Sequence, residues 1–186
     1  MVNLPTQITL SRLLGIPFLF YFLAQPSASY HWWGVGIFLL VAATDWLDGY
    51  LARKLDQVTD LGKFLDPLVD KLLIFAPLLV LVEWGKIPAW GVFLILGREL
   101  AIAGWRVNPN LAGSAISGAN WLGKAKTVTQ ISAIAVLIAP ISDPNWLTFA
   151  QVLFWLAVLL TLISGFSYII TPLLPHPRNE DEQGIH

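Results

Sequence analysis

Six apolar segments, separated by short polar or turn-forming stretches, dominate the 186-residue sequence. Each has close to the roughly 20 residues that a helix needs to cross a bilayer. Charged residues make up only 12% of the chain, about half their usual share in a soluble domain. The sequence therefore predicts an all-α integral membrane protein with six transmembrane helices. The expected spans are Thr6–Ala24, Trp32–Arg53, Lys63–Val82, Pro88–Arg106, Ala125–Ile141 and Trp146–Leu173.

The distribution of basic residues predicts how these helices are oriented. Loops that carry an excess of lysine and arginine remain in the cytoplasm. One set of connections holds only Lys86, whereas the other set and the tail hold Arg53, Lys54, Lys63, Arg106, Lys124, Lys126 and Arg178. We therefore expect both termini to be cytoplasmic, in a bacterial inner membrane. A single membrane domain over 1–174 would be followed by a polar cytoplasmic tail over 175–186.

Composition excludes several classes of function. The chain has no cysteine, which excludes disulfides, thiolate metal sites and cysteine nucleophiles. Its formal net charge of −1 gives no sign of the clustered basic surplus that a nucleic-acid partner requires.

Four aspartates interrupt the second and third apolar segments. Asp45 and Asp48 are three residues apart near the end of one segment, and Asp66 and Asp70 are four apart near the start of the next. These spacings place each pair on one helix face. Charged groups within a membrane are costly and usually mark a functional site. We therefore expect the four carboxylates to converge at one depth.

The carboxylates need compensating charge. Oxygen-only ligands suit hard cations, and two ions of Mg²⁺ or Mn²⁺ would balance four carboxylates in an arrangement used for phosphoryl displacement. Gly49 and Ala52 would leave the adjacent wall low enough for a bulky ligand to approach the backbone. Arg53 has the geometry to hold a phosphate. A cation or proton pathway and a structural ion-pair network are the alternatives that the carboxylates alone leave open.

The order of these residues resembles a known signature. The chain reads Asp45-Trp-Leu-Asp48-Gly49-Tyr-Leu-Ala52-Arg53, then eight residues, then Gly62-Lys-Phe-Leu-Asp66-Pro-Leu-Val-Asp70. This pattern resembles that of the CDP-alcohol phosphotransferases, D-x2-D-G-x2-A-R-x8-G-x3-D-x3-D. The resemblance implies a six-helix membrane enzyme, usually a homodimer, whose site opens to the cytoplasm. Such an enzyme transfers a substituted phosphate from a CDP-linked donor to an alcohol and releases CMP.

Carried over residue by residue, the resemblance assigns roles to the motif. Asp45, Asp48 and Asp66 would be metal ligands, and Asp70 would be the general base and a further ligand. The residues that would border the CDP-diacylglycerol donor, next to membrane lipids, are Asp48, Gly49, Ala52, Arg53 and Gly62.

Flanking segments narrow the choice of acceptor. The amino-terminal stretch 3–12, the stretches Gly97-Arg98-Glu99 and 122–127, and Leu162-Ile163-Ser164-Gly165 resemble family members that use glycerol 3-phosphate. The resemblance leaves acceptors such as phosphatidylglycerol, inositol phosphate or serine as alternatives.

Four cationic residues are the candidates for holding the phosphate of glycerol 3-phosphate. Arg98 and Arg106 are eight residues apart, about two helical turns, so they share a face, and Lys124 and Lys126 begin the fifth segment. For Arg106, Lys124 and Lys126 the alternative is a topology signal alone.

Overall fold

The computed structural model describes the backbone of residues 4–55, 60–107 and 120–170 and the side chains of 11–44, 67–104 and 121–166, Leu122 excepted. Within these residues it contains six α-helices and no strand. The helices are α1 (Leu4–Leu23), α2 (Ala28–Leu55), α3 (Asp60–Glu83), α4 (Ala89–Val107), α5 (Asn120–Ile138) and α6 (Pro144–Ile170). Each overlaps one of the six segments expected from the sequence.

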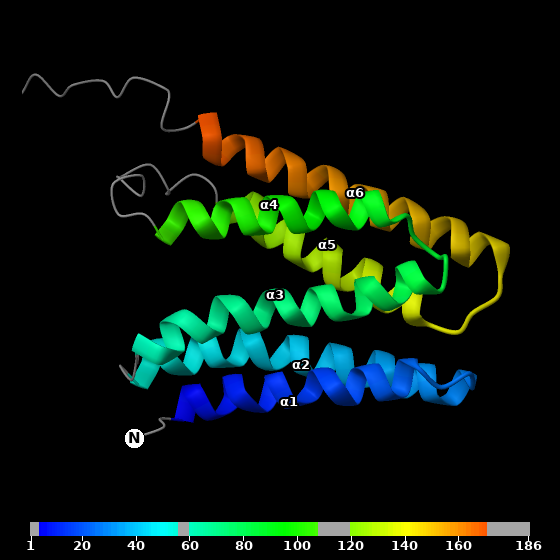
Figure 1. Ribbon diagram of the computed structural model, residues 1–186, viewed down its shortest axis with the longest axis horizontal. Coiled ribbons are helices and arrows are strands. Elements are labelled where there is room, and N and C mark those ends of the chain that lie inside the picture. The colour runs from blue at the N-terminus through cyan, green and yellow to red at the C-terminus, as the bar shows by residue number, and fades with distance from the viewer. Residues whose placement is uncertain (1–3, 56–59, 108–119, 171–186) are drawn as a thin grey trace, which may run out of the picture.

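The helices run side by side in alternating directions (Figure 1). Helix α1 packs against both α2 and α3, and α6 packs against α4 and α5. Contacts of α5 with α2 and α3, and of α3 with α4, connect these two groups. The start of α3 and the end of α2 therefore lie at the same end of the bundle as the end of α4 and the start of α5 (Figure 1).

Backbone and side-chain hydrogen bonds stabilise the α3–α4 turn at the opposite end of the bundle. After α3, Gly85 has a positive φ of 67°, a backbone conformation in which a Cβ is disfavoured. Its N–H and that of Lys86 donate to the carbonyls of Val82 and Leu81, the pattern that terminates many helices. Lys86 Nζ in turn donates to the Leu137 carbonyl, 2.6 Å away, in the last turn of α5. These contacts hold the α3–α4 turn against α5.

Helix boundaries differ from the expected ones mainly in α5. That helix starts at Asn120, five residues before the expected Ala125. It ends at Ile138 rather than Ile141, before Pro140, which has no N–H with which to continue the helix. The connection 108–119 and the expected tail over 175–186 lie outside the described residues.

The interior is apolar, and so is much of the surface. Phe38, Leu81, Ile138 and Phe154 are almost completely buried where the helices meet. Large apolar side chains are also exposed on every helix, for example Phe18, Leu40, Leu79, Phe93, Val128 and Val152. Large apolar side chains exposed on all six helices suit a surface that contacts lipid or a partner.

Among the described residues, one segment is long and apolar enough to cross a membrane by itself. It is Pro144–Phe166 in α6, with a mean hydropathy of 2.1 over its most apolar window. The other helices carry charged residues within their apolar stretches, such as Arg98 and Glu99 in α4.

Candidate active site

A cavity of about 380 Å³ lies among four helices. It combines apolar walls with both acidic and basic side chains. The residues that line it are Ala42 of α2; Pro67, Asp70, Lys71, Leu73 and Ile74 of α3; Glu99 of α4; and Lys126, Thr127, Gln130 and Ile131 of α5. The candidate base Asp70 and the candidate phosphate ligand Lys126 therefore line the same cavity.

An ion pair from α1 holds Asp70. The Nη1 atom of Arg12 donates to Oδ1 of Asp70 at 2.6 Å. The Arg12 side chain is only 2% exposed, whereas that of Asp70 is 40% exposed. The guanidinium thus lies behind the carboxylate and fixes its orientation while the carboxylate remains accessible from the cavity.

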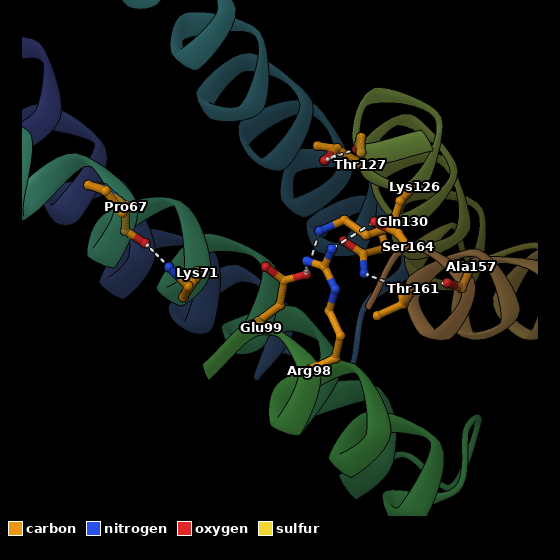
Figure 2. Close-up of polar contacts among 11 residues, drawn as sticks. Pro67, Lys71, Arg98, Glu99, Lys126, Thr127, Gln130, Ala157, Thr161 and Ser164 are labelled. Carbon is orange, nitrogen blue, oxygen red and sulfur yellow. Dashed lines mark hydrogen bonds and ion pairs between the residues drawn. The ribbon is translucent and has the colours of Figure 1, made fainter. Parts of the chain in front are cut away.

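A second charged cluster joins α4, α5 and α6 (Figure 2). Glu99 Oε1 accepts hydrogen bonds from Arg98 Nη1, at 3.0 Å, and from Lys126 Nζ. Arg98 also donates through Nη2 to the hydroxyl oxygen of Ser164, at 2.7 Å. Glu99 therefore connects two cations that come from different helices.

Polar contacts also connect α5 and α6 beside this cluster. One turn after Lys126, Gln130 donates through Nε2 to the Thr161 hydroxyl at 2.9 Å, and that hydroxyl donates to the Ala157 carbonyl at 2.7 Å. Gln130 and Thr161 are both buried, so these bonds satisfy polar groups that water does not reach. They fix the position of α5, and with it Lys126, relative to α6.

Positive charge exceeds negative charge among the described side chains of the site. Four cations, Arg12, Lys71, Arg98 and Lys126, face two carboxylates, Asp70 and Glu99. Lys71 and Lys126 line the cavity and place positive charge where an anionic ligand would bind. A phosphate is the chemical group that arginine and lysine side chains bind in this way.

The acidic motif lies on the two helices next to the cavity. Asp45 precedes the end of α2 at Leu55 by ten residues, and Asp70 follows the start of α3 at Asp60 by ten. At about 1.5 Å per residue, both lie about 15 Å along their helices from the same end of the bundle. Asp48 and Asp66 are correspondingly seven and six residues from those ends. The two helices thus carry the four aspartates at matching depths.

Only Asp70 of the motif has a described side chain. The helices place the backbone of Asp45, Asp48, Gly49, Ala52, Arg53, Gly62 and Asp66, and their side chains lie outside the described part. Among the side chains that are described, no three His, Asp or Glu residues lie close enough to hold a metal ion. The donor set itself, four carboxylates on two adjacent helices, fits hard divalent cations.

The four expected phosphate ligands differ in position. Lys126 lines the cavity, whereas Arg98 lies behind Glu99, outside the lining. Lys124 is exposed and does not line the cavity, and the Arg106 side chain lies outside the described residues. Of the three whose side chains are described, only Lys126 lies at the wall that Asp70 shares.

Two cations of the site were not assigned a role from the sequence. Lys71 lines the cavity, and its Nζ donates to the Pro67 carbonyl at 2.9 Å. A lysine directly after the last motif aspartate, within an apolar segment, is a signal that would have identified it. Arg12 gave the same signal, but its partner, 58 residues away, is visible only in the fold.

Comparisons with known proteins identify the family of this chain. The CDP-alcohol phosphatidyltransferase family model matches residues 2–163. A CDP-diacylglycerol--glycerol-3-phosphate 3-phosphatidyltransferase of Bacillus subtilis (strain 168) is 41% identical over 187 residues, covering 90% of this chain and 94% of that protein. A protein of the same name from Rickettsia bellii (strain RML369-C) is 33% identical, covering 89% of this chain and 93% of that protein. Since the family model and both relatives extend over most of its length, the chain belongs to the CDP-alcohol phosphatidyltransferase family.

Proposed function

We propose that this protein transfers the phosphatidyl group of CDP-diacylglycerol to sn-glycerol 3-phosphate, giving phosphatidylglycerophosphate and CMP. The observation that carries this proposal is the cavity in which Asp70 and Lys126 share a wall. It offers a carboxylate for the acceptor hydroxyl and a cation for the acceptor phosphate. The names of the relatives support the same pair of substrates.

The chain's own residues have separate tasks in the transfer. Asp70, held by Arg12, takes the proton from the C1 hydroxyl of glycerol 3-phosphate. That oxygen forms a bond to the phosphorus next to diacylglycerol, and the bond from this phosphorus to the CMP oxygen breaks. Lys126 holds the acceptor phosphate, with Arg98, Arg106 and Lys124 as the further cations of this end of the bundle. Asp48, Gly49, Ala52, Arg53 and Gly62 border the donor.

Asp45, Asp48, Asp66 and Asp70 would hold two divalent cations, Mg²⁺ or Mn²⁺. When bound, such ions neutralise charge on a diphosphate and stabilise a phosphate leaving group.

The membrane arrangement is part of the proposal. All six helices span the bilayer, with both termini and the cavity at the cytoplasmic side of a bacterial inner membrane. Support comes from the apolar side chains exposed on every helix and from the basic residues at the cavity end of the bundle. The homodimer stays a prediction.

An acceptor panel tests the proposal. Purified protein in detergent with CDP-diacylglycerol and Mg²⁺ is offered glycerol 3-phosphate, phosphatidylglycerol, inositol phosphate or serine, each radiolabelled. We expect CMP release and labelled lipid with glycerol 3-phosphate alone. Labelled lipid from another acceptor would contradict the proposed substrate. Cation-dependent currents or proton flux in vesicles, without CMP release, would favour the transporter alternative.

A further inference from the structure

Two small residues of α6 lie directly against Arg98. Ser164 and Gly165 are both buried, and the proposed reaction gives neither a task. The sequence singled them out only as part of the stretch Leu162-Ile163-Ser164-Gly165. The structure shows what they contact.

Gly165 leaves room for the stem of Arg98. A Cβ atom built on Gly165 would lie 2.8 Å from Cγ of Arg98 and 3.5 Å from its Nε. Real Cβ atoms essentially never approach so closely, so any larger residue at 165 must displace the arginine side chain. The methylene groups of Arg98 thus lie against bare helix backbone.

Ser164 holds the other end of the same side chain. Its hydroxyl accepts the 2.7 Å hydrogen bond from Arg98 Nη2, and its exposure is 0%. The methylene groups of Arg98 lie against Gly165, and its Nη2 is bonded to Ser164. In this conformation the Nη1 atom of Arg98 donates to Glu99 (Figure 2). Ser164 and Gly165 therefore specify one conformation of Arg98.

The contact continues to the cavity wall. Glu99 accepts hydrogen bonds from both Arg98 and Lys126. Glu99 and Lys126 line the cavity, whereas Arg98 does not. Without Arg98, the Glu99 carboxylate would lose one of the two cations that fix its position. A lysine ammonium on a flexible stem is held in place only by such partners.

We propose that Ser164 and Gly165 are positioning residues of the acceptor-phosphate site. They hold Arg98 in one conformation, in which it fixes the Glu99 carboxylate. Glu99 in turn fixes Lys126 at the cavity wall. This rests on the proposed function, because it assigns the contact with the acceptor phosphate to Lys126. It makes α6, none of whose described side chains lines the cavity, a determinant of acceptor affinity.

The variant Gly165→Ala tests the proposal because its methyl group displaces Arg98 without removing any polar atom. Steady-state kinetics are measured with each substrate varied in turn. We expect the KM for glycerol 3-phosphate to rise about ten-fold, the lower end of the loss of one charge-assisted contact. The KM for CDP-diacylglycerol should stay unchanged. An unchanged KM for glycerol 3-phosphate in Gly165→Ala would overturn the proposal.

Gly91→Ala is the matched control. Gly91 lies in the same pair of helices, and its Cβ would meet Phe154 Cζ at 2.9 Å, a comparable crowding far from the charged cluster. This variant should lower thermal stability and leave both KM values as in the parent. An equal rise in the glycerol 3-phosphate KM for Gly91→Ala would show that crowding between α4 and α6 is the cause, and would overturn the role of Arg98.

A double-mutant cycle identifies the intermediary. If Gly165→Ala acts through Arg98, adding it to Arg98→Ala should raise the KM no further, since the stem that it displaces is gone. Additive effects would overturn the proposal. Should Gly165→Ala fail to fold, Ser164→Ala gives the same comparison, with rescue by Ser164→Thr, which keeps the hydroxyl. Ser164→Ala with a parental KM would then overturn it.

Failure of the proposed function is distinguishable. If the parent uses inositol phosphate instead of glycerol 3-phosphate, the substrate assignment is wrong, and the same comparison of KM values on that acceptor decides the positioning role. If the parent uses only an acceptor without a phosphate, both proposals are wrong.

Discussion

Arg12 and Asp70 are separated by 58 residues and joined by a 2.6 Å hydrogen bond between Nη1 and Oδ1. The bond connects α1 to α3 and places a buried guanidinium behind the last aspartate of the motif. The amino-terminal helix, which carries none of the motif, thereby contributes to the site.

Removing the Arg12 guanidinium should impair both turnover and stability. Arg12→Gln leaves Asp70 without its charged partner, and we expect kcat to fall about ten-fold or more, since a charge-assisted hydrogen bond contributes about 1.5–3 kcal/mol. Arg12→Lys keeps the charge but lacks the planar guanidinium, so its kcat should lie between those of the parent and of Arg12→Gln. Steady-state kinetics and thermal unfolding in detergent measure the two effects. Parental turnover in Arg12→Gln would show that Asp70 does not depend on it.

The motif aspartates should respond to loss of charge. Asp45→Asn, Asp48→Asn and Asp66→Asn should each abolish turnover, because each loses a metal ligand's charge while keeping its size. Asp70→Asn should be nearly inactive yet still bind CDP-diacylglycerol, if proton removal is its main role. A chelator should inactivate the parent, and Mg²⁺ or Mn²⁺ should restore it.

The control for these variants is Asp143→Asn. Asp143 caps α6 at the opposite end of the bundle, accepting a 2.7 Å bond from the N–H of Asn145, and asparagine caps helices equally well. Its activity should equal that of the parent. Full activity of Asp45→Asn or Asp66→Asn at saturating metal would contradict the two-metal assignment.

Lys126 and Lys124 should differ sharply as acceptor ligands. Lys126 lines the cavity, and Lys124 is exposed two residues away. Lys126→Gln should lower kcat/KM for glycerol 3-phosphate by about ten- to a hundred-fold, the equivalent of one charged contact to phosphate. Lys124→Gln should change it far less. If both substitutions change kcat/KM for glycerol 3-phosphate equally little, neither lysine binds the acceptor phosphate, and both serve only as topology signals.

Cysteine labelling tests the orientation, since the chain has no cysteine of its own. Ser142→Cys lies in the α5–α6 turn and Lys124→Cys at the cavity end, and both positions are exposed. An impermeant maleimide should label Ser142→Cys in intact cells, and Lys124→Cys only after permeabilisation. The reverse pattern would invert the topology.

Lys86 should give the folded protein a measurable pH dependence. Burial lowers the pKa of Lys86, so the folded state binds this proton more weakly than the unfolded state does. Stability therefore rises with pH from the lowered pKa up to about 10.4, where the unfolded lysine also loses its proton. Thermal unfolding of the parent and of Lys86→Met at several alkaline pH values checks this. The parent should gain stability relative to the variant as pH rises, and parallel curves would contradict it.

The helices and the reaction class were accessible from the sequence for physical reasons. Apolar length and turn residues such as Pro26 define six helices, and fixed spacing along α2 and α3 defines a family signature. The start of α5 was misplaced because Gly123 and Lys124 indicated the end of a loop, yet the helix begins before them, at Asn120.

Contacts between distant residues were not accessible in this way. Nothing along the chain indicates that Arg12 contacts Asp70, because this contact follows from the packing of α1 on α3. The same applies to Arg98, whose charge suggested a phosphate ligand. Its hydrogen bond to Ser164, 66 residues away, follows from the packing of α4 on α6.

The position of Ser164 near the carboxyl end has a consequence for biosynthesis. Helix α6 follows the other five described helices in the chain and so leaves the ribosome after them, and it is the one described helix apolar enough to enter a membrane by itself. Until α6 inserts, Arg98 lacks its contacts with Ser164 and Gly165, and the side chains of the acceptor-phosphate site are not yet in position. A nascent chain that stops after α5 already carries every motif aspartate, but its Arg98 lacks the contact with Ser164, so we expect the acceptor-phosphate site to be completed only when α6 packs against α4.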